Sequence, residues 1–314
     1  MSELLGVKHT VIVFGSINMD LVTRTPRLPV PGETLLGREF FTAPGGKGAN
    51  QAVAIARLGL TTQMVGRVGG DSNGRELINS LKTAGVQTNH VLVDREASSG
   101  VAAIAVDDIG ENQIIVVPGV NGRVDETDVE RLLHLLPSAR ALLLQFEIPM
   151  SAVVLAAQTA RSAGVPVILD PAPAQLDVPT KLYSLVDIIT PNETEAGQMV
   201  GFPVTDPDSA AQAADVLRQK GVGTAIVKLG ANGAVCATKE ETFFVPAFSV
   251  SAVDTVAAGD AFNGGLATAL AEGLPLRQAV VWGAAAGALA STKPGAQSSM
   301  CDRATFDAFL KTRE

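Results

Sequence analysis

The sequence predicts an α/β fold, a mostly parallel β-sheet flanked by helices on both faces, with a small antiparallel β-sheet attached. Short runs rich in β-branched residues alternate with segments of helical periodicity, as in parallel sheets covered by helices. The 314 residues are 46% hydrophobic but only 4% aromatic, and 31 of them are glycines. Such a composition predicts a large core with closely packed helices. Length alone suggests about two domains, but no linker interrupts the alternation, so we expect one domain over residues 1–314.

The expected elements follow one another along the chain. The strands of the main sheet are predicted at residues 10–13, 62–65, 141–145, 166–169, 187–190 and 224–228. The helices between them are predicted at residues 48–58, 73–84, 125–135, 151–163, 193–200 and 209–220. Three further helices close the chain, at residues 258–272, 276–291 and 303–312.

Two segments break the alternation. Residues 21–41 are rich in Pro and Thr, and residues 100–106 and 113–117 form a hairpin candidate around a polar turn. We expect a small antiparallel sheet, from about 21–41 and 98–118, that covers a cleft as a lid. An edge sheet without a role is the alternative.

Composition excludes several classes of function. A net charge of −8 and an isoelectric point near 5.0 argue against binding nucleic acid or an anionic membrane. No apolar run reaches the ~18 residues of a membrane-spanning helix, and the first residues lack a signal-peptide pattern, so we expect a cytoplasmic protein. The three histidines and two cysteines lack the spacing of a zinc site, a redox pair or a Ser-His-Asp triad.

The most informative segment is DTVAAGDAFNGG, residues 254–265. Small residues at a helix start let an anion approach several backbone N–H groups, where the helix dipole also favours it. Asp260 falls in the first turn beside that anion position. It suits a general base for a hydroxyl group next to a phosphoryl group in transit. An acidic residue that merely favours the dipole is the alternative.

A second segment, GGKGANQA at residues 45–52, opens the first long helix. Its glycines permit close backbone approach, and Lys47 and Asn50 bring donors to the helix start. It is not a phosphate-binding P-loop, and no G-x-G-x-x-G follows the first strand, which argues against a nicotinamide-dependent oxidoreductase. Taken alone, the segment fits a flexible turn with a helix cap equally well.

Together, in this order and about 200 residues apart, the two segments resemble the signatures of the ribokinase family, the PfkB-type carbohydrate kinases. The resemblance runs from about residue 11 to residue 299. It implies transfer of the γ-phosphoryl group of ATP to the 5-hydroxyl of D-ribose, with Asp260 as the base. The developing charge would be stabilised by the amides of Ala257, Ala258 and Gly259.

Other functions remain open beside this one. A deoxyribokinase, a fructokinase or a nucleoside kinase would carry the same two segments. A catalytically silent sugar-binding regulator is the alternative from another class. The intact Asp260, Gly259 and Asn192 argue against it.

Polar residues follow the carboxyl ends of predicted strands, where open α/β sheets bind ligands. Asn18 and Asp20 follow the first strand, and Glu147 follows the third. They could instead form turns or an exposed loop. The resemblance implies that they contact the sugar, together with Gly46, Lys47, Asn50 and Asp260.

The resemblance implies that two more segments bind the nucleotide. Asn192 begins a predicted helix with Glu195 three residues later, a capping arrangement that needs no function. The resemblance implies that this pair holds Mg²⁺ and the nucleotide phosphates through water. Lys228, Gly230 and Gly233 form a glycine-rich turn between strands, and the resemblance places it, with Gly259, against the nucleotide.

The loop after the 276–291 helix contains Pro-Gly, which by itself only ends the helix. The resemblance implies a potassium ion held by the Asp254 side chain, the Ser299 hydroxyl, and backbone oxygens of Val256, Ala290, Lys293 and Gly295. Relatives often carry a polar residue near the adenine where this chain has Ala284.

The small sheet has a further implication. Apolar residues would line one of its faces, namely Val101, Ala103, Ile115 and Val117. An uncovered apolar face is unfavourable in water, and the resemblance implies that two lids clasp each other in a homodimer.

Overall fold

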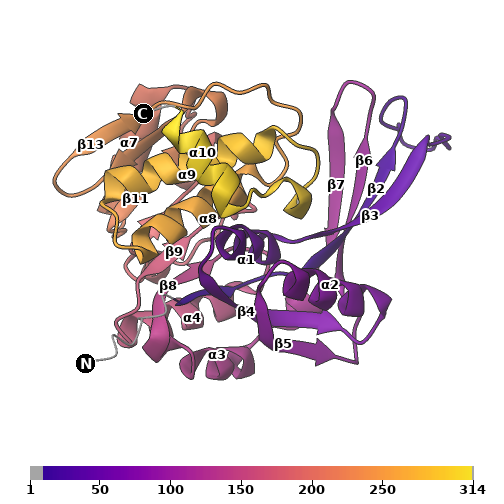
Figure 1. The fold of residues 1–314 in the computed structure, drawn as a ribbon, viewed down its shortest axis with the longest axis horizontal. Coiled ribbons are helices and arrows are strands. Elements are labelled where there is room, and N and C mark those ends of the chain that lie inside the picture. Colours follow the sequence, from indigo (N-terminus) through magenta and orange to yellow (C-terminus); the bar gives the residue numbers. More distant parts are fainter. Residues whose placement is uncertain (1–9, 313–314) are drawn as a thin grey trace.

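The computed structural model describes residues 10–312 and consists of a nine-stranded main sheet, helices on both of its faces and a four-stranded small sheet (Figure 1). The main sheet has the order β13-β12-β11-β10-β9-β8-β1-β4-β5 and is parallel except at β12 and β13. Its strands are β1 (Thr10–Phe14), β4 (Thr61–Gly69), β5 (Gln87–Asp94), β8 (Ala139–Leu144), β9 (Val167–Leu169), β10 (Ile188–Ile189), β11 (Thr224–Lys228), β12 (Ala234–Ala237) and β13 (Thr242–Val245).

The predicted α/β architecture is confirmed: the six strands predicted for the main sheet are present, β12 is the strand expected after the glycine-rich turn, and two further strands were not predicted. These are β5 and β13, which form the two edges of the main sheet. β5 reads QTNHVLVD and β13 reads TFFV, each with buried and exposed positions mixed. An edge strand is covered less completely than a central one, so its hydrophobic pattern is weaker.

Alternate residues of the strands enter two separate cores, one on each face. In β1, Val11 and Val13 enter the core beneath α1, α2, α8, α9 and α10, whereas Ile12 and Phe14 enter the core beneath α3, α4, α6 and α7. The first group of helices is α1 (Lys47–Arg57), α2 (Ser72–Thr83), α8 (Ala258–Ala271), α9 (Leu276–Ser291) and α10 (Arg303–Lys311). The second is α3 (Glu126–Leu133), α4 (Met150–Ser162), the short α5 (Thr180–Tyr183), α6 (Glu193–Val200) and α7 (Pro207–Gln219).

Two glycines let α8 pack closely between α1 and α9 on the first face of the main sheet. A Cβ atom at Gly264 would collide with Ala54 of α1, and one at Gly265 would lie 2.6 Å from the Trp282 carbonyl oxygen of α9. Neither position has room for a Cβ atom. The residue types therefore set how near α8 lies to α1, and this matters because both helices begin at the candidate site.

The small sheet contains β2 (Asn18–Arg24), β3 (Glu39–Gly45), β6 (Gly100–Val106) and β7 (Asn112–Val117), in the order β3-β2-β6-β7. It projects from the main body in Figure 1. The expectation of an antiparallel sheet is corrected in one respect, because β2 and β6 pair in parallel. β1 and β5 run in the same direction in the main sheet, so the strands that leave their carboxyl ends do as well.

The small sheet also begins earlier and ends later than residues 21–41. Asn18 and Asp20 lie in β2 itself, and β3 continues to Gly45, next to the start of α1. The small sheet therefore leads directly into the candidate site. Within residues 10–312, none of the helices combines the length and apolarity needed to cross a bilayer.

Candidate active site

Asp260 lies in the first turn of α8, with 4% of its surface exposed. The N-cap residue before the helix is Ala257, whose φ of 58° is left-handed and unusual for a residue with a side chain. The Ala258 amide donates to the Thr255 carbonyl oxygen at 3.2 Å. It would have to exchange this partner in order to bind an anion.

Two consecutive side chains of α1 bind the two oxygens of the Asp260 carboxylate. Asn50 Nδ2 donates to Oδ2 at 2.9 Å, and Gln51 Nε2 donates to Oδ1 at 3.1 Å. Burial raises the pKa of Asp260 above its usual range, against the opposing effect of Lys47, and Asp170 adds to the rise. The carboxylate is therefore held in one orientation and has a raised affinity for a proton.

Lys47, the first residue of α1, supplies positive charge at the same place. Burial works against that charge, but the carboxylates of Asp260, Asp170, Glu147 and Glu195 outweigh it and raise the pKa of Lys47. The ammonium group is consequently charged at every physiological pH. It is available to bind a further anion.

Glu147, in the loop after β8, is held by donors from the loop after β1, from β2 and from α1. Its Oε2 accepts from Ser16 Oγ at 2.5 Å, from the Lys47 amide at 3.0 Å and from Asn18 Nδ2 at 3.4 Å. The Lys47 amide belongs to the first turn of α1, so it has no acceptor within the helix, and the helix dipole favours an anion there. Glu147 therefore lies at the start of α1, beside Asn18.

The orientation of the Asn18 amide follows from its other partner. Asn121 Nδ2 donates to Asn18 Oδ1 at 2.7 Å, so the Asn18 NH₂ group points toward Glu147. Nearby Asp20 has a pKa of about 7, raised by burial and then by the negative charges of Glu147 and Asp260. The group of polar side chains at this edge thus offers both a donor and an acceptor. A Cβ at Gly45 would lie 2.6 Å from Asp20 Oδ1, so a larger residue there would displace the Asp20 carboxylate.

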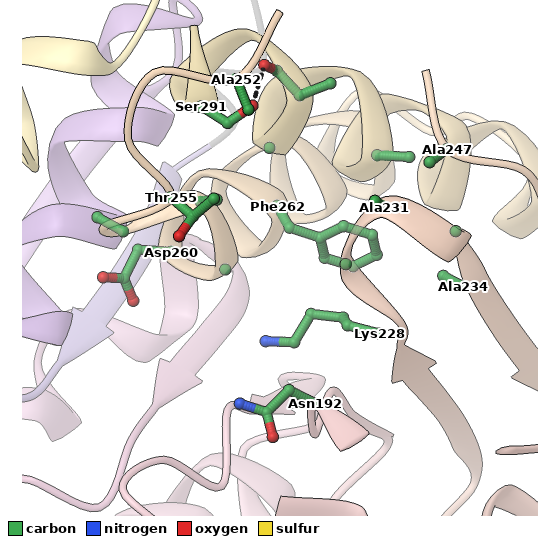
Figure 2. A pocket seen from close by; sticks show the side chains of 18 of the residues that line it. Asn192, Lys228, Ala231, Ala234, Ala247, Ala252, Thr255, Asp260, Phe262 and Ser291 are labelled. Atoms are coloured by element: carbon green, nitrogen blue, oxygen red, sulfur yellow. Dashed lines mark hydrogen bonds between the residues drawn. The ribbon is translucent and has the colours of Figure 1, made fainter. Parts of the chain in front are cut away.

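A cavity of about 670 Å³ opens on the other side of Asp260. Its walls come from the starts of α1, α6 and α8, the end of β11 and the inner face of α9 (Figure 2). Small residues dominate the part next to α9, including Ala231, Ala247, Ala252 and Ala284. Among the predicted nucleotide residues, those that line it are Asn192, Glu195, Lys228, Gly230, Gly233 and Gly259.

The predicted capping arrangement at Asn192 is present. The Glu195 amide donates to Asn192 Oδ1, and the Asn192 amide donates to Glu195 Oε2, both at 2.8 Å. Burial, followed by the charge of Asp170, raises the pKa of Glu195, whereas Lys228 opposes the rise. The Glu195 carboxylate at this wall of the cavity therefore binds a proton more readily than an exposed one.

Lys228 extends from the end of β11 across the cavity, toward the side on which Asp260 lies (Figure 2). Its Nζ forms an ion pair with Asp170 Oδ1 at 3.1 Å. The same atom would lie 3.3 Å from a Cβ at Gly259. The lysine ammonium is thus close to the first turn of α8.

The predicted potassium residues come from two loops that Asp254 joins. Its Oδ1 accepts from the Val256 amide at 2.9 Å and its Oδ2 accepts from the Gly295 amide at 2.8 Å. Ser299, which is fully buried, donates to the Ala296 carbonyl oxygen at 2.7 Å. Ala290 lies in the last turn of α9, where its carbonyl oxygen accepts from the Lys293 amide at 3.3 Å.

Comparison with known proteins identifies the family. Residues 8–303 match the pfkB family of carbohydrate kinases. The chain belongs to this family. The predicted resemblance is therefore confirmed, over nearly the whole chain.

Relatives within the pfkB family match at full length. The chain is 43% identical over 305 residues to the ribokinase of Haemophilus influenzae, covering 97% of this chain and 99% of the relative. It is 35% identical to a deoxyribokinase of Salmonella typhi, covering 97% of this chain and 99% of the relative. A structure of Arabidopsis thaliana ribokinase complexed with ribose and ATP superposes with a TM-score of 0.89 at 34% identity, covering 96% and 99% of the two chains.

The structure also adds polar residues that the pfkB signatures did not reveal. Gln51, Gln145 and Asp170 form a buried network beside Asp260, while Asn121 and Ser16 hold Asn18 and Glu147. Two of these residues have the same sequence feature that pointed to Glu147, a polar residue at the carboxyl end of a predicted strand. Gln145 and Asp170 each lie at the carboxyl end of a predicted strand, where ligands bind in open sheets.

Proposed function

We propose that this protein transfers the γ-phosphoryl group of ATP to the 5-hydroxyl group of D-ribose, producing ribose 5-phosphate and ADP. The observation that carries the proposal is the position of Asp260. It lines the cavity and is also bound by Asn50 of α1, the helix whose start lies beside Glu147 and Asn18. The ribokinase relatives support ribose as the acceptor.

The sugar would bind at the start of α1. Asn18 offers its NH₂ group to a hydroxyl oxygen, and the ionised Asp20 accepts hydroxyl protons. Gly46, Lys47, Asn50 and Glu147 complete this edge. A Cβ at Gly46, whose φ is 88°, would lie 2.7 Å from the Asn18 amide nitrogen, so glycine is required for the approach.

Asp260 would act as the general base. It takes the proton of the 5-hydroxyl group as the sugar oxygen forms its bond to the γ-phosphorus. The bond from that phosphorus to the bridging oxygen breaks at the same time, and ADP carries the electron pair away. A raised pKa favours this role, because it makes the carboxylate a stronger base.

Negative charge that develops on the phosphoryl group would be stabilised at the start of α8. The Ala257, Ala258 and Gly259 amides lie at this helix start, where the Ala258 amide would exchange its Thr255 partner for the anion, and the helix dipole has the favourable sign. Lys47 on the sugar side and Lys228 on the cavity side add positive charge.

The nucleotide would fill the cavity, with Gly230 and Gly233 against it. Mg²⁺ fits the wall at Asn192 and Glu195, because burial and the charge of Asp170 raise the affinity of the Glu195 carboxylate for positive charge. Mg²⁺ commonly retains several waters, so these residues would hold it indirectly. When bound, it neutralises charge on the phosphates.

A potassium ion fits the two loops that Asp254 joins, because every ligand atom that these residues would offer to the ion is an oxygen. The Asp254–Gly295 hydrogen bond brings both loops together, and the ion would be held by the Asp254 and Ser299 side chains and by the backbone of Val256, Ala290, Lys293 and Gly295. The Asp254 segment leads directly into the start of α8.

A homodimer through the small sheet is part of the proposal. Val101 pairs with Val117 and Ala103 pairs with Ile115, so these four residues share one face. Ile115 is 67% exposed and Val117 is 50% exposed. A second copy would cover this apolar face and complete the lid over the sugar site.

A second candidate substrate is 2-deoxy-D-ribose, which the deoxyribokinase relative favours. ADP release should be measured with D-ribose, 2-deoxy-D-ribose, D-fructose and adenosine under matched conditions. We expect the highest kcat/KM with D-ribose. We also expect the NMR spectrum of the product to be that of ribose 5-phosphate. A higher value with another acceptor would overturn the assignment of ribose.

A further inference from the structure

Gln51 donates hydrogen bonds to two buried carboxylates of the site, Asp260 and Asp170, from a single nitrogen. Its Nε2 donates to Asp260 Oδ1 at 3.1 Å and to Asp170 Oδ2 at 3.0 Å. Gln51 is fully buried, and Asp170 is only 3% exposed. The side chain amide has two N–H bonds, and each carboxylate receives one of them.

A third residue determines which end of the Gln51 amide faces the carboxylates. Gln145 Nε2 donates to Gln51 Oε1 at 2.7 Å, which uses the oxygen as an acceptor. The NH₂ group of Gln51 must then point at Asp260 and Asp170. If the amide were turned over, its oxygen would face two carboxylates, which is unfavourable.

The far end of the network reaches the cavity. Asp170 Oδ1 accepts from Lys228 Nζ at 3.1 Å, and Lys228 lines the cavity close to Gly259. A continuous path therefore runs from Asp260 through Gln51 and Asp170 to Lys228. It joins the base to an ammonium group close to the first turn of α8.

We infer that Gln51 is a positioning residue of phosphoryl transfer, which holds the Asp260 carboxylate at a fixed distance from Asp170 and its Lys228 partner. This inference rests on the proposed function of Asp260 as base. Asn50 alone would leave the carboxylate able to turn about its one remaining hydrogen bond. Gln51 removes this freedom by binding the second oxygen.

Asp170 has the complementary task in this arrangement. It anchors the Gln51 amide with one oxygen and Lys228 with the other, so both groups keep the same spacing. A displacement of about 1 Å in reacting groups can lower a rate by about 10²-fold. Removing the anchor should therefore lower kcat without removing any contact to the sugar.

The first test replaces the glutamine with a residue of similar length that cannot form hydrogen bonds. Gln51→Met should lower kcat by about 10-fold to 10²-fold, while calorimetric affinities for D-ribose and for a non-hydrolysable ATP analogue stay near wild type. Gln63→Met is the matched control, because Gln63 pairs with Gln87 on the main sheet. It should keep the wild-type kcat.

A double-mutant cycle with Asp260→Asn distinguishes positioning from a general structural effect. If Gln51 acts through Asp260, adding Gln51→Met to Asp260→Asn should change the residual kcat by less than about 3-fold. Losses that multiply would overturn the inference, as would an unchanged kcat in Gln51→Met alone. If Gln51→Met fails to fold, Asp170→Asn keeps the side chain shape and takes its place in the same cycle.

The outcomes also separate this inference from the proposed function. A wild-type protein without activity on any of the sugars tested would reject the proposed function. An active wild type whose Asp260→Asn variant is impaired, together with a fully active Gln51→Met variant, would reject only the positioning role.

Discussion

Asn50 Nδ2 lies 2.9 Å from Asp260 Oδ2, and this hydrogen bond joins residues 210 positions apart in the chain. It connects the start of α1, where Glu147 and Asn18 lie, to the start of α8 beside the cavity. Gly264 allows the two helices to approach closely enough for the bond to form. The position of the proposed base therefore depends on how α1 and α8 pack.

Replacing the proposed base should separate chemistry from binding. Asp260→Asn keeps the size of the side chain and removes its ability to take a proton. We expect kcat to fall by about 10²-fold to 10⁴-fold with sugar and ATP affinities near wild type. Steady-state kinetics and calorimetry measure these quantities. A variant that keeps more than about a tenth of the wild-type kcat would exclude Asp260 as the base.

Sugar affinity should depend on the ionisation of Asp20. Burial and two neighbouring carboxylates raise its pKa from 3.8 to about 7, and only the ionised form accepts two hydroxyl protons. The affinity for D-ribose should therefore increase as pH rises through about 7. Titration calorimetry of the wild-type protein in the absence of ATP checks this without turnover, and it keeps both carboxylates that raise the Asp20 pKa. An affinity that is constant over this range would contradict it.

The same residue should make folding less favourable at high pH. The unfolded chain loses the Asp20 proton near pH 3.8, whereas the folded protein keeps it until about pH 7. Asp20 therefore lowers the free energy of unfolding progressively as pH rises between these values. We expect Asp20→Asn to raise the melting temperature at pH 8 more than at pH 5, in buffers of matched ionic strength. Equal changes at both pH values would show that the group is not perturbed.

Potassium should activate the protein without contacting a substrate. Sodium is smaller and holds its water more tightly, so it should replace potassium poorly among fixed carbonyl oxygens. We expect kcat/KM to be higher in potassium than in sodium or a large organic cation, and the preference to disappear in Asp254→Ala. Identical wild-type rates in all three buffers would rule out the site.

A charged residue on the apolar face of the small sheet should dissociate the proposed homodimer. Ile115→Asp places a carboxylate where a second copy would pack, and the mutated position is exposed in the single chain. We expect light scattering to give the dimer mass for the wild type and the monomer mass for the variant. Thr312→Asp, at the end of α10, is the control and should remain dimeric. A fully active wild-type monomer would reject the proposal.

The sequence by itself determined the features that depend on near neighbours. Alternation of strand and helix patterns predicted the main sheet and its helices. The Asn192–Glu195 spacing predicted the capping box, because both of its hydrogen bonds close within four residues. The segments around Lys47 and Asp260 predicted the family. Each combines a helix start with small residues that let a ligand approach the backbone N–H groups.

Only the tertiary structure decided how these local features meet. Asp170 and Gln51 are 119 residues apart, and nothing in either segment indicates that one amide binds two carboxylates. The parallel pairing of β2 and β6 likewise follows from the direction of β1 and β5 in the main sheet. Such contacts depend on strand order and on the distance between packed helices. Because these quantities arise from the whole core at once, a local pattern of residues does not contain them.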